Sequence, residues 1–128
     1  MDFIDAAIAI VVRDGKVLVC QRKDDDVLGG YWEFPGGKCE PGETLEHCLA
    51  REVREELDVD AIVGETLFTT THEYPDRVVE LHFMRCRLPA DPRAVLGQEI
   101  AWVAREDLGA LTFPPADAEL IRLLMRER

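Results

Sequence analysis

The sequence is poor in positive charge and has no long apolar run. Of its 128 residues, 15 are Lys or Arg and 26 are Asp or Glu, so the formal net charge is -11. Phosphate backbones select basic protein faces, and this balance therefore argues against a nucleic-acid polymer as partner. A single nucleotide stays compatible with it if metal ions mediate the contact.

Membrane and export signals are also missing. No stretch approaches the length of a transmembrane helix, and the apolar N-terminal run follows acidic rather than basic residues. We therefore expect no membrane contact and a cytoplasmic location.

Cysteine is sparse, and the four cysteines, at positions 20, 39, 48 and 86, form no Cys-x-x-Cys pair. A chain of this length with 47% hydrophobic residues can build a core without disulfides, so we expect reduced thiols. A zinc site is the alternative, although no ligand spacing fits it. Its ligands would be drawn from Cys39, His47, Cys48, His72 and His82.

What the sequence does contain indicates one domain, residues 1–128, of α/β class. Apolar runs at 6–12 and 16–22 flank an Asp-Gly turn, which favours a hairpin. Residues 61–74, 77–88 and 99–103 read as strands, residues 105–111 as a short helical turn, and residues 115–128 as a closing helix. We expect a mixed sheet with helices on both faces.

A second helix is predicted from about Thr44 to Leu57, because apolar residues recur there every four positions and Thr44 is a suitable N-cap. On this helix Glu52, Glu55 and Glu56 fall within an arc of roughly 100°. The ordinary interpretation is a solvated acidic face paired with neighbouring arginines.

Two costs weigh against that interpretation. A helix C-terminal end disfavours carboxylates, and like charges at these spacings repel. A bound divalent cation would offset both, and carboxylate oxygens are the ligands that Mg²⁺ prefers. The preceding loop, "FPGGKCEPGE", contains glycines that let the backbone approach an ion or a phosphate closely.

The same segment resembles the Nudix box, the signature of the Nudix hydrolase family. Eight of its nine fixed positions match: Gly37, Glu43, Arg51, Glu52, Val53, Glu55, Glu56 and Val59. Asp58 stands where the pattern has Gly, and we expect it to adopt the left-handed conformation. Segments such as "GGYWEFPGGKCEPGE", "PDRVVELHF" and "FPPADAELI" extend the resemblance to the MutT-like branch of the family.

The resemblance implies the Nudix α/β/α sandwich with a mixed β-sheet between helices. It also implies Mg²⁺-dependent hydrolysis of nucleoside triphosphates to the monophosphate and pyrophosphate, with Mn²⁺ as a substitute metal. The implied substrates, in nucleotide-pool sanitisation, are 8-oxo-(d)GTP or (d)CTP and modified cytidine triphosphates. A monomer or a homodimer fits the family. The alternatives are a Nudix hydrolase of another nucleoside diphosphate derivative and a non-catalytic nucleotide-binding module.

Site residues follow from the resemblance position by position. The implied catalytic residues are Arg51, Glu52, Glu55 and Glu56. The implied metal ligands are the Gly37 carbonyl, Glu52, Glu55, Glu56 and Glu99. The implied substrate contacts are Arg22, Phe34, Lys38 and Asp117.

Three of these assignments leave alternatives open. Glu52 is either the general base or a metal ligand, and Glu99 is either a ligand or the exposed start of a strand. Ionised Asp117 only accepts hydrogen bonds and suits the cytosine amine, whereas a protonated Asp117 could read 8-oxoguanine. Arg51 and Glu43 resemble a pair that ties the loop to the helix.

Overall fold

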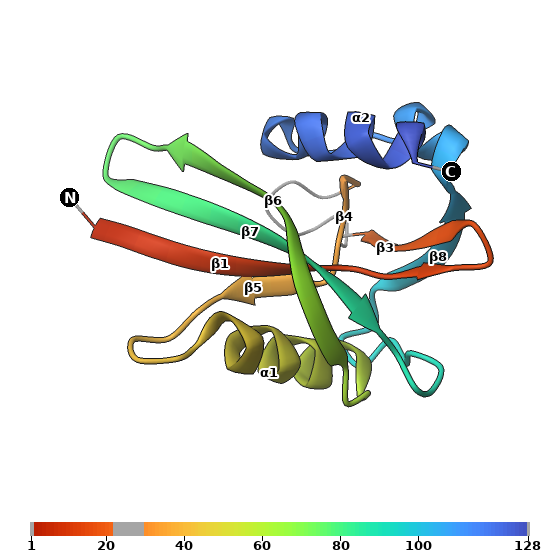
Figure 1. Ribbon diagram of the computed structural model, residues 1–128, viewed down its shortest axis with the longest axis horizontal. Helices are drawn as coiled ribbons and strands as arrows, with labels where there is room; N and C mark the ends of the chain where they lie inside the picture. Colours follow the sequence, from red (N-terminus) through yellow and green to blue (C-terminus); the bar gives the residue numbers. More distant parts are fainter. Residues whose placement is uncertain (1, 22–29, 128) are drawn as a thin grey trace.

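The protein is described by a computed structural model that covers residues 2–21 and 30–127. Two sheets form its centre (Figure 1). The first has the order β5 (Gly36–Lys38), β1 (Asp2–Ile10), β7 (Arg77–Arg87), β6 (Ile62–Glu73). In the second, β3 (Lys16–Gln21) pairs with β2 (Val12–Arg13), β4 (Trp32–Glu33) and β8 (Glu99–Ala104).

The first sheet is mixed, as the sequence predicts. β1 runs parallel to β7, whereas β5 and β6 are antiparallel to their neighbours. A parallel pair needs a long connection between its strands, and here the chain between β1 and β7 supplies most of the second sheet and the first helix.

Helices cover both faces of the first sheet. In Figure 1, α1 (Leu45–Leu57) lies below the sheet and α2 (Ala118–Arg126) lies above it, after the short helices η1 (Arg105–Ala110) and η2 (Pro115–Asp117). Side chains alternate between the faces, as the pleat requires. Ala9 and Met84 belong to the core between the sheet and α1, whereas Ile10 and Phe83 belong to the core that includes α2.

The N-terminal hairpin is shorter than the two predicted runs. Only β2 pairs with β3 around the turn at Asp14 and Gly15, both of which have positive φ angles of 53° and 76°. Residues upstream of Val11 leave this pairing and form β1, which is buried between β5 and β7 in the first sheet. Burial on both faces of β1 accounts for this central position.

No helix within residues 2–21 and 30–127 is both long and apolar enough to cross a membrane.

Candidate active site

Helix α1 begins and ends as the sequence predicts. The Thr44 hydroxyl caps it by accepting a hydrogen bond of 3.1 Å from the His47 amide. At the other end Asp58 adopts φ 56° and ψ 42°, and its amide donates to the Arg54 carbonyl. Its apolar stripe, which includes Leu49 and Val53, is fully buried against the sheet. Glu52 and Glu56 lie beside this stripe on the helix, so its burial also turns them toward β5.

Two of the three glutamates meet the backbone of β5. The Gly36 amide donates a hydrogen bond of 2.9 Å to Glu56 Oε2. A Cβ atom placed on Gly37 would lie 2.5 Å from Glu52 Oε2, so any other residue there would displace that carboxylate from its position. Gly36 is also restricted to glycine, because its φ is 143° and a Cβ there would collide with the Ala7 carbonyl oxygen. Glu55 lies further out and is 58% exposed.

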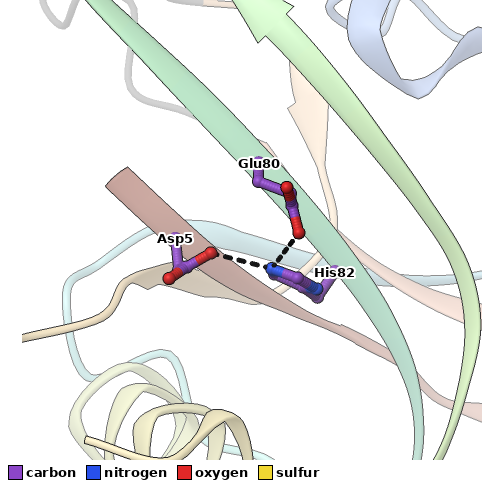
Figure 2. A group of neighbouring side chains, drawn as sticks. All are labelled: Asp5, Glu80 and His82. Atoms are coloured by element: carbon purple, nitrogen blue, oxygen red, sulfur yellow. Dashed lines mark hydrogen bonds and ion pairs between the residues drawn. The ribbon is translucent and has the colours of Figure 1, made fainter. Parts of the chain in front are cut away.

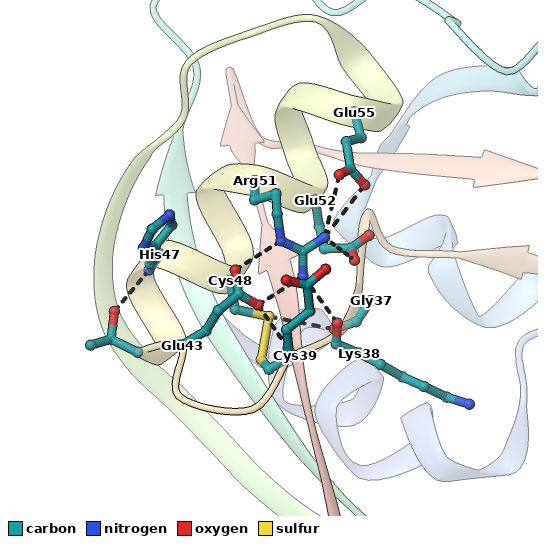
Figure 3. A network of polar contacts seen from close by, with 11 residues as sticks. Gly37, Lys38, Cys39, Glu43, His47, Cys48, Arg51, Glu52 and Glu55 are labelled. Atoms are coloured by element: carbon teal, nitrogen blue, oxygen red, sulfur yellow. Dashed lines mark hydrogen bonds and ion pairs between the residues drawn. A yellow bond between two sulfur atoms is a disulfide. The ribbon is translucent and has the colours of Figure 1, made fainter.

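Arg51 connects the loop before α1 to the acidic face, as Figure 3 shows. Its Nε and Nη2 donate to the two oxygens of Glu43, each at 2.8 Å, in a bidentate pair. Its Nη1 donates to Glu52 Oε1 at 3.0 Å, and Nη2 reaches the Lys38 carbonyl at 3.3 Å. The predicted tie between Glu43 and Arg51 is confirmed, and the same guanidinium orients the Glu52 carboxylate.

Charge is distributed unevenly in this network. The hydrogen bonds from Arg51 lower the pKa of Glu43 to about 2, so Glu43 is ionised at neutral pH. Burial raises the pKa of Glu56 to about 8, an effect that the charges of Glu52 and Glu33 reinforce. Burial also raises the pKa of Glu52, although Arg51 opposes this shift. Neighbouring, partly buried carboxylates with raised pKa values are typical of functional sites.

A later loop closes over the C-terminal end of α1. The Gln98 side chain donates to the Glu56 carbonyl at 3.1 Å, and the amides of Arg93 and Val95 donate to the carbonyls of Leu57 and Glu56. No local pattern in the sequence indicates this role of Gln98. The next residue, Glu99, is the exposed first residue of β8 and pairs with Gln21 of β3. Its part in metal binding stays a prediction.

Two of the predicted substrate contacts, Phe34 and Asp117, lie on the side of the protein that carries α2. Phe34 is buried and stacks on Phe113 with ring centroids 5.1 Å apart, so it belongs to the core that includes α2. Burial raises the pKa of Asp117 to about 7, and the charge of Glu33 adds to the shift. Glu33, in β4, therefore lies within electrostatic reach of both Asp117 and Glu56. The sequence did not single out Glu33.

The remaining substrate contacts stay predictions. Lys38 is exposed at the end of β5, and Arg22 lies outside the described residues.

The expectation of four reduced thiols is wrong for two of them. Cys39 and Cys48 form a disulfide, whereas Cys20 and Cys86 are free and buried. The Cα atoms of the bonded pair are 5.2 Å apart, within the range that a disulfide spans. The path of the loop into α1 creates this proximity, which a search for Cys-x-x-Cys does not detect. The disulfide also removes both sulfurs from the alternative zinc site.

Comparisons with known proteins agree with this geometry. The model of the NUDIX domain family matches residues 6–123. The chain is 37% identical to the CTP pyrophosphohydrolase of Escherichia coli, over all of this chain and 96% of that protein. It is 35% identical to the 8-oxo-dGTP diphosphatase of Haemophilus influenzae, over 97% of this chain and 93% of that protein. The solution structure of the E. coli ORF135 protein superposes with a TM-score of 0.85 at 36% identity, covering 98% of this chain and 90% of that one.

Proposed function

We propose that this chain, which belongs to the NUDIX domain family, hydrolyses nucleoside triphosphates to the monophosphate and pyrophosphate with Mg²⁺. Hydrolysis of nucleotide pyrophosphate bonds is the activity named for its relatives, and this chain is an enzyme of that class. We propose 8-oxo-(d)GTP or (d)CTP as its substrate, since relatives named for each match nearly the whole chain. Its role would be to remove such triphosphates from the nucleotide pool.

The observation behind this proposal is the convergence of Glu52 and Glu56 on the backbone of Gly36 and Gly37. The Glu52 carboxylate occupies space that any side chain at position 37 would fill. Both carboxyls are partly buried, and each has a raised pKa because its charge is poorly solvated. An all-oxygen donor set with excess negative charge fits Mg²⁺.

In this proposal Glu52, Glu56 and the Gly37 carbonyl would hold the cation, with Glu55 at the solvent side. When bound, the cation neutralises phosphate charge and lowers the pKa of water. Glu52 would accept the proton of the attacking water if it serves as the general base instead of as a ligand. Arg51 donates to Glu52, which favours the ionised form of this carboxylate against the effect of burial and fixes its orientation. Glu43 is held ionised by the same guanidinium and keeps Arg51 in place.

The reaction is tested with a panel of unmodified and oxidised nucleoside triphosphates in Mg²⁺. Release of pyrophosphate rather than orthophosphate supports the proposed reaction, and a preference for a cytidine or an 8-oxoguanine triphosphate identifies the substrate. Release of orthophosphate alone, or hydrolysis confined to nucleotide sugars, would contradict it.

Variants of α1 test the assigned roles. Glu52→Gln and Glu56→Gln keep side-chain volume, and each is expected to lower kcat by about 100-fold or more. The matched control is Glu46→Gln, an exposed glutamate in the first turn of the same helix. Circular dichroism must report a folded protein in each case. Near-normal turnover of Glu56→Gln at low Mg²⁺ would mean that Glu56 is not a metal ligand.

A further inference from the structure

We propose that Asp5, Glu80 and His82 form a second cation site, specific for Zn²⁺ and related transition-metal ions. These residues lie on β1 and β7 and include none of the α1 glutamates (Figure 2). One ligand atom from each lies within 4.8 Å of the others. The proposal is independent of the function assigned to α1.

Strand register brings the three side chains together. Asp5 is the direct partner of Glu80 in the parallel pair of β1 and β7. His82 follows two residues after Glu80 and therefore points to the same face of the sheet. Two carboxylates opposite each other on neighbouring strands repel, so this pairing is unfavourable without a positive charge between them.

The His82 ring cannot supply a hydrogen bond to each of the two carboxylates. Its Nε2 atom lies 3.0 Å from Asp5 Oδ1 and 3.3 Å from Glu80 Oε1. One imidazole nitrogen bears at most one hydrogen, so it cannot donate a full hydrogen bond to both carboxylates. A metal ion bound to Nε2 in place of that hydrogen can bond to both.

The spacing matches a tetrahedral ion. Zn²⁺ binds nitrogen and oxygen ligands at about 2.0–2.1 Å, so two ligands of a tetrahedron lie about 3.3 Å apart. The separations of Nε2 from the two carboxylate oxygens, 3.0 and 3.3 Å, are close to this value. The site therefore needs little rearrangement to accept the ion.

The donor set and its surroundings select the metal. Imidazole together with carboxylates favours zinc-like ions over Mg²⁺, which prefers oxygen ligands alone. The His82 side chain is only 11% exposed, so packing fixes its ring. The side chains of Asp5 and Glu80 are 60% and 49% exposed, which leaves room for water as the fourth ligand. The ion would clamp β1 onto β7.

Isothermal titration of the full chain with Zn²⁺ tests the site, with excess Mg²⁺ present to occupy the α1 carboxylates. We expect one Zn²⁺ per chain and a rise in Tm. His82→Gln is expected to weaken Zn²⁺ binding by about 10-fold or more, since it removes a ligand. His72→Gln is the matched control, because His72 lies on β6 and its ring contacts Tyr74 instead.

Exposed ligand variants keep the test decisive if His82→Gln fails to fold. Asp5→Asn and Glu80→Gln should each weaken Zn²⁺ binding and abolish the rise in Tm. Undiminished Zn²⁺ binding in both of these variants would overturn the proposal. Loss of binding in Glu56→Gln alone would also overturn it, because the ion would then belong to α1. Neither result bears on nucleotide hydrolysis.

Discussion

Glu56→Gln should remove a pH-dependent destabilisation of the metal-free protein. Burial raises the pKa of Glu56 from 4.5 to about 8, whereas the unfolded chain keeps the ordinary value. Between these values the folded state binds more protons than the unfolded state, so stability falls as pH rises. Between about pH 5 and about pH 8, this one carboxyl is expected to lower the free energy of unfolding by on the order of 3 kcal/mol.

The assay is urea unfolding in EDTA at several pH values across that range, for the wild type and for Glu56→Gln. The amide does not titrate, so the stability of the variant relative to the wild type should increase from the acidic to the alkaline end. Asp117 titrates in both proteins, and its contribution cancels in the comparison. Glu55→Gln is the control, because Glu55 is a neighbouring carboxyl that is 58% exposed.

In the proposed metal site this proton would compete with the cation. Glu56 must lose it before the carboxylate can bind Mg²⁺, so apparent Mg²⁺ affinity should rise with pH up to about 8. Saturating Mg²⁺ should therefore restore much of the stability that the wild type loses at high pH. Parallel curves for the wild type and Glu56→Gln in EDTA would refute the reasoning, because Glu56 would then have the same pKa in both states.

Three further changes have defined outcomes. Asp58→Gly should stabilise the protein by up to about 1 kcal/mol, since Asp58 has a left-handed backbone; a lower urea midpoint would contradict this. Reduction of the disulfide between Cys39 and Cys48, which are nine residues apart, should lower the free energy of unfolding by about 3 kcal/mol, as measured with and without dithiothreitol. The Cys39→Ser/Cys48→Ser variant should show no such response. Asp117→Asn should lower kcat/KM for a cytidine triphosphate more than for an 8-oxoguanine triphosphate; equal effects would mean that Asp117 does not read the base.

The start and end of α1 were predictable from the sequence because they depend on residues close together in the chain. The period of its apolar residues, the Thr44 cap and the left-handed Asp58 are all readable within one segment, and all are confirmed. The Glu43–Arg51 pair was predictable from the family resemblance, since it lies inside the same segment. Here spacing along the chain translates directly into position in space.

Contacts between distant segments were not predictable in this way. Asp5 meets His82 only because β1 pairs with β7 in parallel, and no local pattern specifies that register. The apolar runs at 6–12 and 16–22 predicted a hairpin. In the structure only β2 pairs with β3 around the turn, and the start of the first run belongs to β1. Cys39 and Cys48 likewise meet through the path of a loop. In each case tertiary packing, which a single sequence does not display, selects the partner.

Glu33 links the carboxyls of α1 and Asp117 electrostatically. In the sequence-based assignment, the glutamates of α1 and Asp117 fall into separate groups. The charge of Glu33 nevertheless raises the pKa of both Glu56 and Asp117, in addition to the larger effect of burial. With its pKa raised to about 7, Asp117 populates both its ionised and its protonated form near neutral pH. The ionised form accepts only and suits the cytosine amine, whereas the protonated form can also donate. In the proposed function, where Asp117 reads the base, the choice between cytosine and 8-oxoguanine would therefore depend on the electrostatics that Glu33 and burial impose, and not on the identity of residue 117 alone.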